Sequence, residues 1–144
     1  MSILSIAIIV FMALELTNVA TLYFWPGSRL ANGVGVFSGW EKSKADPELH
    51  QFVRYLVFWV AGTKLIFIAL LLVILLTTGE QTQLWTVVAL IASIFSFFWR
   101  LFPIVRSLDR AGQITPAGYS KGLGGMVAGF IALFALALVV SLVW

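Results

Sequence analysis

Four stretches of the sequence are apolar over the length of a membrane-spanning helix. They cover about residues 3–25, 52–77, 84–105 and 121–143. A helix needs about 20 residues to cross the hydrocarbon core of a bilayer, and in lipid only helices or closed barrels satisfy their own backbone hydrogen bonds. No strand-like alternation of polar and apolar residues occurs in these stretches. The sequence therefore predicts an all-α integral membrane protein with four transmembrane helices.

The composition of the chain leads to the same fold class. Of 144 residues, 61% are hydrophobic and 10% are charged, whereas a soluble domain carries about 25% charged residues. A chain of this length makes one domain, and we expect residues 1–144 to form a single antiparallel four-helix bundle. There is no cysteine and no sequence motif of a metal or phosphate site, so we expect neither a metal nor a cofactor.

Basic residues are distributed very unevenly along the chain. Eight of the nine Lys and Arg residues lie in or beside two segments, about residues 26–51 and 106–120: Arg29, Lys42, Lys44, Arg54, Arg100, Arg106, Arg110 and Lys121. The connection 77–83 and both chain ends contain none. Because basic residues accumulate on the cytoplasmic side, we predict that both segments are cytoplasmic loops and both termini lie outside. The compact chain favours a bacterial cytoplasmic (inner) membrane.

This distribution also explains the net charge of +3 without a nucleic-acid partner. Arg106, Arg110 and Lys121 should contact anionic lipid headgroups at the cytoplasmic surface. Trp40, in the first cytoplasmic loop, is expected to reach the same headgroup region. The predicted partners are therefore the lipid bilayer and other membrane helices, either of foreign subunits or of further copies of this chain.

Capping signals predict where helices begin and bend. The run 46–48 (Asp-Pro-Glu) matches an N-cap, a first helical position and an acidic first turn, so the second helix should begin before the membrane. The pair 115–116 (Thr-Pro) is a similar signal for the start of the fourth helix. Pro103, near the end of the third span, should kink that helix.

Glu15 and Lys64 are charged residues near the middle of the first and second spans. One unpaired charge at that depth costs at least about 2.5–3.5 kcal/mol. Consecutive spans run in opposite directions, and at about 1.5 Å rise per residue the two side chains reach a similar depth. We therefore predict that Glu15 and Lys64 form an ion pair, with Asn18 one turn from Glu15 on the same face.

Two interpretations of this pair remain open. In the first it is structural and holds the first two helices together. In the second it belongs to a proton or cation pathway, because ionisable residues within a membrane often mark such pathways. A lysine partner supplies a full countercharge and so leaves Glu15 less free to bind a cation, but buried pairs are rarely retained for stability alone.

The third span carries a polar stripe of Ser93, Ser96 and Arg100, spaced at i, i+3 and i+7. One interpretation is hydrogen bonding between helices, with Arg100 extending towards the cytoplasmic headgroups. The alternative is that the stripe lines a half-open cytoplasmic cavity that ends at Glu15.

The fourth span is rich in glycine, at positions Gly118, Gly122, Gly125 and Gly129. Glycines four residues apart allow two transmembrane helices to approach closely. We expect this face to pack on another helix, which could belong to this chain, to a second copy or to a foreign subunit.

The position of Glu15 is similar to that of the essential glutamate in helix one of the small multidrug resistance transporters, which also have four short helices. The similarity covers only that span, and the chain departs from the family in its longer first loop, its Lys64 and its basic asymmetry. Membrane-associated eicosanoid and glutathione enzymes are similar in length and orientation, but their helix-two pattern of Glu, Arg, Asn and Glu is missing here. Both are similarities of topology and assign no family.

Three functional hypotheses follow. The first is a non-enzymatic accessory or structural subunit that packs against other membrane helices, because glycines for close packing are present and catalytic motifs are not. The second is a small proton- or cation-coupled transporter that acts as a homo-oligomer, with Glu15 as the titrating group. The third is an enzyme on a lipophilic substrate that would use His50, Arg54 and Arg100. His50 is the only histidine and is expected at headgroup level rather than as a metal ligand.

Overall fold

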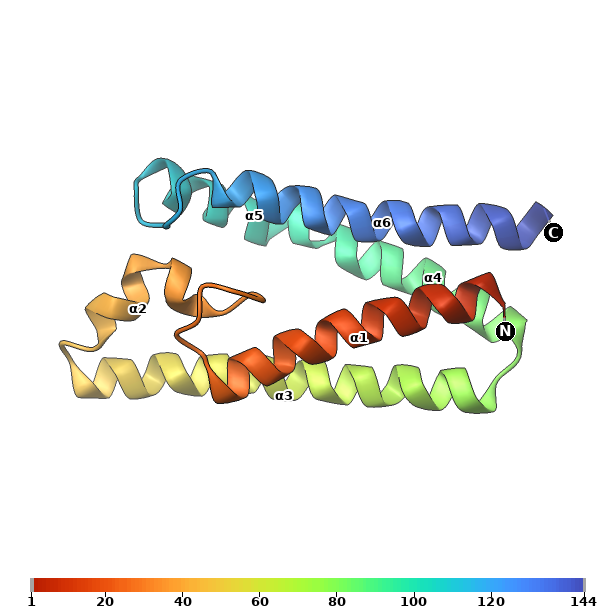
Figure 1. The fold of residues 1–144 in the computed structure, drawn as a ribbon, viewed down its shortest axis with the longest axis horizontal. Coiled ribbons are helices and arrows are strands. Elements are labelled where there is room, and N and C mark those ends of the chain that lie inside the picture. The colour runs from red at the N-terminus through yellow and green to blue at the C-terminus, as the bar shows by residue number, and fades with distance from the viewer. Residues whose placement is uncertain (1, 144) are drawn as a thin grey trace.

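The computed structural model describes residues 2–143, and the elements of this part of the chain are helices (Figure 1). In chain order they are α1 (Ile3–Phe24), η1 (Val34–Val36), α2 (Ser38–Ser43), α3 (Pro47–Thr77), α4 (Glu80–Phe95), α5 (Phe97–Arg110) and α6 (Tyr119–Val143). Four helical segments are long and apolar enough to cross a membrane: α1, α3, α4 with α5, and α6. The predicted all-α fold class, with four helices long and apolar enough to span a membrane, is confirmed.

The long helices share two ends. The N- and C-termini and the α3–α4 connection lie at one end of the molecule, here named the terminal end (Figure 1). The short helix α2 and the α5–α6 connection lie at the opposite end, here named the α2 end. The two segments richest in basic residues therefore lie at the same end.

The second long helix begins where its capping residues predict. Asp46 is the N-cap of α3, and its carboxylate accepts hydrogen bonds from the backbone N–H groups of Glu48 (3.0 Å) and Leu49 (3.2 Å). Pro47 occupies the first helical position, where its missing N–H has no intrahelical acceptor to lose. The helix therefore begins at Pro47 rather than at about residue 52, ahead of its most apolar part.

The third span is interrupted at Ser96, a position that the sequence did not predict. Ser96 separates α4 from α5, and Pro103 lies inside α5. At the break the backbone makes tighter i to i+3 hydrogen bonds, from Ser96 N to Ser93 O and from Trp99 N to Ser96 O. The Ser96 hydroxyl donates to the same Ser93 carbonyl at 2.6 Å and so competes with the regular helical bond.

The start of α6 also differs from the expectation. The helix begins at Tyr119, after the Thr115 and Pro116 pair that was expected to cap it. The capping acceptor is Asp109, near the end of α5. Its carboxylate accepts from Gly118 N (2.9 Å), from Ser120 N (2.9 Å) and from the Ser120 hydroxyl (2.6 Å). A carboxylate at the free N–H groups of a helix start is stabilising, and here it comes from a neighbouring helix.

The helix α1 packs against different partners along its length. Its first half, including Leu4 and Phe11, belongs to a buried cluster with α3, α4 and α6, in which Phe134 is fully buried. Its second half packs on α3, where Leu22 contacts a cluster that contains Ala61. α1 therefore crosses from the other long helices towards α3 as it approaches the α2 end (Figure 1). Near that end α1 and α3 separate from α5 and α6.

The loops at the α2 end are joined to each other. Phe37 and Ile114 form an isolated antiparallel bridge, with hydrogen bonds from Ser38 N to Gln113 O and from Thr115 N to Val36 O. Side chains of both loops pack with α5 in a buried cluster of Val36, Val105 and Ile114. The segments expected as plain loops are therefore an ordered cap on this end.

Gly35 is essential to the shape of this cap. A Cβ at position 35 would overlap the carbonyl oxygen of Gly27, whereas one at Gly39 of α2 would meet nothing within 4 Å. The chain folds back here, with Val34 N donating to Pro26 O and Gly35 N donating to Ser28 O. Because Gly35 has no side chain, the backbone of residues 34–35 can lie directly against that of residues 26–28.

We predict that Gly35→Ala lowers the stability of the purified protein by about 1–3 kcal/mol, the usual result of overpacking. Gly39→Ala is the matched control and should be neutral or slightly stabilising, since alanine favours helix over glycine. The measurement is the midpoint of thermal unfolding in detergent. Equal midpoints for the two variants would contradict the tight contact.

Candidate functional site

Glu15 and Lys64 form an ion pair between α1 and α3. The Lys64 ammonium donates to Oε2 of Glu15, and the Asn18 amide donates to Oε1 at 3.4 Å. The Glu15 side chain is 11% exposed and that of Lys64 is 29% exposed. The lysine is thus the member of the pair that is more accessible from outside the protein core.

A cavity of about 740 Å³ lies beside this pair and extends towards the α2 end. Its walls come from all the long helices and from the loop that follows α1, and they are mainly apolar. Its polar lining residues are Glu15, Asn32, Lys64, Ser93, Ser96, Arg100 and Tyr119.

The polar stripe of the third span lies on the wall of this cavity. Ser93, Ser96 and Arg100 all line it. The Ser96 hydroxyl bonds to a carbonyl of its own helix, not to another helix. This placement matches the alternative in which the stripe leads through a cavity to Glu15.

Arg100 has no carboxylate partner within residues 2–143. The ion pairs in that part of the chain are Lys44–Glu41 and Lys64–Glu15. The Arg100 guanidinium lies over the ring of Trp99, 5.1 Å from its centroid. A cation over an aromatic face is stabilised, but its charge is not neutralised.

The glycines of α6 have different surroundings. Gly122, Gly125 and Gly129 are exposed, and a Cβ on any of them would meet nothing within 4 Å. Gly118 lies in the turn before α6, with a positive φ of 83°, so it is not part of the helical face. We use the name glycine face for Gly122, Gly125 and Gly129.

Among the glycines of α6, Gly124 is the one that packs against another helix of this chain. No sequence pattern singled it out. It is buried, and a Cβ there would lie 2.7 Å from the Phe102 ring of α5. Four of the glycines in this helix lie within eight residues, so their spacing alone does not show which face meets α5. The close approach of α5 and α6 is visible only in the fold.

The three residues expected at lipid headgroups are all exposed at the α2 end. Arg106 and Arg110 lie in the last turns of α5, and Lys121 lies in the first turn of α6. Trp40 does not follow the expectation for headgroup contact. It is 7% exposed and packs against Gly27 and the His50 ring.

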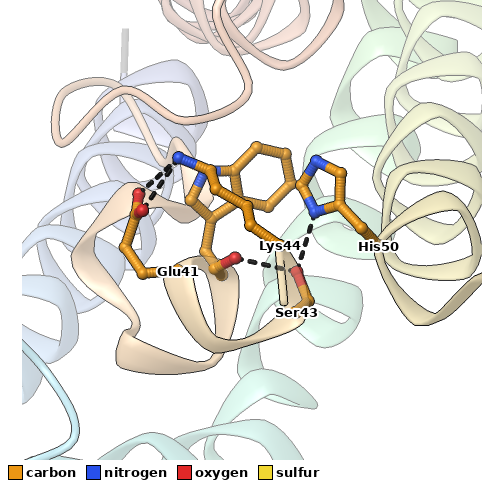
Figure 2. A network of polar contacts seen from close by, with 5 residues as sticks. Glu41, Ser43, Lys44 and His50 are labelled. Atoms are coloured by element: carbon orange, nitrogen blue, oxygen red, sulfur yellow. Dashed lines mark hydrogen bonds and ion pairs between the residues drawn. The ribbon is translucent and has the colours of Figure 1, made fainter. Parts of the chain in front are cut away.

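His50 belongs to a structural network that joins α2 to the start of α3. Figure 2 shows the Ser43 hydroxyl facing the His50 imidazole, at 2.8 Å from Nδ1. The same hydroxyl donates its one hydrogen to the Trp40 carbonyl at 2.7 Å, so His50 Nδ1 carries the proton and donates to Ser43. Ser43 is therefore not arranged as a nucleophile activated by His50.

Within residues 2–143, no three His, Asp or Glu side chains lie together in a way that could hold a metal ion. Four helices long and apolar enough to span a bilayer are compatible with a small integral membrane protein. Comparisons of the chain with protein-family models, curated proteins and solved structures found no match. Its function must therefore be argued from its own residues.

Reversal of the ion pair should reveal its contribution to folding. We predict that Glu15→Lys and Lys64→Glu each destabilise the protein by about 3–5 kcal/mol, because each places two like charges together at a buried site. The double variant should recover most of this loss. The yield of monodisperse protein and its midpoint of thermal unfolding in detergent are the measurements.

Glu80→Lys is the control for this experiment, because Glu80 is exposed at the start of α4. It should leave the midpoint close to that of the wild type. If the double variant is no more stable than the single ones, the pair does not hold α1 against α3.

Proposed function

We propose that the protein is a non-enzymatic structural or accessory subunit that packs against another transmembrane helix through the glycine face of α6. The observation that carries this proposal is that Gly122, Gly125 and Gly129 are exposed and have open space in front of them. Within the chain, α6 uses a different side, with Gly124, to pack on α5.

The physical reason lies in how helices associate in lipid. Lipid tails are as apolar as leucine, so helices associate through close packing rather than through hydrophobic burial. Small residues at i, i+3 and i+7 bring a partner backbone close along two turns of helix. Ala132 is also exposed and extends the same row by one turn. A second copy of this chain or a foreign membrane subunit would meet these requirements equally.

The orientation that accompanies this proposal is an antiparallel bundle with both termini outside the cytoplasm. It is supported by the basic residues near the α2 end, including Arg106, Arg110 and Lys121, which would lie among cytoplasmic headgroups. The terminal end contains no Lys or Arg. A bacterial inner membrane is the proposed location.

We predict that Gly125→Leu releases the partner without unfolding the chain. Leucine favours helix by roughly 1 kcal/mol relative to glycine, so α6 should still form, while its side chain would block close approach of another helix. The measurement is native mass spectrometry after extraction in mild detergent at natural expression level. Wild type should arrive in a complex of fixed stoichiometry, and the variant should arrive alone.

Ala69→Leu on α3 is the control, since Ala69 is an exposed small residue outside the glycine face. It should keep the complex of the wild type. A wild-type chain that arrives alone, or a Gly125→Leu chain that keeps its partner, would refute the proposal.

A second function is favoured by one observation, the position of the Glu15–Lys64 pair on the wall of a cavity. A pair reached from a cavity could exchange protons, as a small proton-coupled transporter requires. Lys64 compensates the charge of Glu15, so a proton suits this site better than a larger cation.

This second function predicts that proteoliposomes of the wild type collapse an imposed pH gradient faster than empty vesicles. Glu15→Gln, whose amide cannot ionise, should behave like empty vesicles. The double variant Glu15→Gln with Lys64→Met removes both charges, so neither is left unpaired. It tests whether proton flux requires Glu15 when the site is neutral. Proton flux retained by both variants would exclude Glu15 as the titrating group.

A further inference from the structure

The cavity beside the ion pair has the size and lining of a site for a lipophilic ligand. Its volume of about 740 Å³ lies within the range of about 300–1,000 Å³ of typical ligand sites. Large apolar side chains on its walls remain accessible: Val60 is 51% exposed, Leu101 53% and Met126 43%. An apolar chain placed against them would gain close van der Waals contacts with these side chains.

The charges on the cavity wall determine which ligand head is favoured. Glu15 and Lys64 compensate each other. Arg100 has no carboxylate partner within residues 2–143, so the lining of the cavity carries one unbalanced positive charge. A cationic head would be repelled, and a neutral one would not neutralise the guanidinium.

Arg100 is also well placed along the cavity. It lies seven residues after Ser93, about 10 Å further along the helix at about 1.5 Å per residue, in the direction of the α2 end. Ser93 and Arg100 line the same cavity as the ion pair. A head held at Arg100 would thus lie about two helical turns from Ser93.

We propose that this cavity binds one anionic amphiphile, with its apolar chain on the apolar walls and its carboxylate or phosphate head at Arg100. A guanidinium suits either head, because its planar fork donates two parallel hydrogen bonds to two oxygens. The head can come from a free fatty acid or from a membrane phospholipid. Both sources offer the same chemistry.

Binding can be measured by native mass spectrometry of the full chain in mild detergent with added oleate. Methyl oleate has the same chain without the charge, and oleylamine has the opposite charge. We expect one oleate per chain, and binding of methyl oleate or oleylamine weaker by about tenfold or more, the usual effect of losing a charge-assisted hydrogen bond. Dioleoylphosphatidylglycerol, compared with dioleoylphosphatidylcholine, tests the phospholipid source.

Three variants separate this site from non-specific adsorption. Arg100→Gln should weaken oleate binding by about tenfold or more. Val60→Phe should reduce it by filling the cavity without changing any charge. Lys42→Gln should bind like the wild type, because Lys42 is exposed and does not line the cavity.

The outcomes decide between the sources or overturn the proposal. A preference for oleate supports a fatty acid, and a preference for phosphatidylglycerol supports a phospholipid. Equal binding of oleate and methyl oleate overturns the proposal. So does wild-type affinity in both Arg100→Gln and Val60→Phe, or an equal loss in Lys42→Gln.

Discussion

Two opposite charges near the middle of a membrane-spanning region constrain how this chain can fold. Neither Glu15 nor Lys64 is stable there alone, since a single charge costs at least about 2.5–3.5 kcal/mol at that depth. Their ion pair places the second half of α1 against α3. The first half of α1 is held elsewhere, in the apolar cluster around Phe11 and Phe134. α1 therefore contacts α3 in both halves, and contacts α4 and α6 as well in its first half.

The crossing of α1 gives the molecule its cavity. Where α1 follows α3, it leaves space beside α5 and α6, and residues of the loop after α1, including Asn32 and Phe37, line that space. The ion pair consequently lies on a cavity wall rather than in a sealed core. The Glu15–Lys64 contact can therefore hold α1 against α3 and also form part of a ligand or proton site, because both residues line the cavity.

Much of the fold could be predicted from local sequence. Four apolar segments are long enough to cross a membrane, and an N-cap at Asp46 acts as its residue type predicts. Signals that compete with neighbouring contacts were less reliable. The helix breaks at Ser96, whose hydroxyl competes for a backbone carbonyl, and no local signal predicted that break. Asp109, on another helix, replaces the expected cap at Thr115.

The sequence by itself determined which segments are apolar enough for a membrane and which residues are too polar to remain there unpaired, because both follow from the free energy of transfer of each side chain. The tertiary structure decided what those residues face. It buried Trp40 and Gly124, left Gly122, Gly125 and Gly129 open, and lined a cavity with Arg100. These outcomes depend on the angle and rotation at which one helix meets another. That geometry is set by many contacts between distant residues, and no local pattern encodes it.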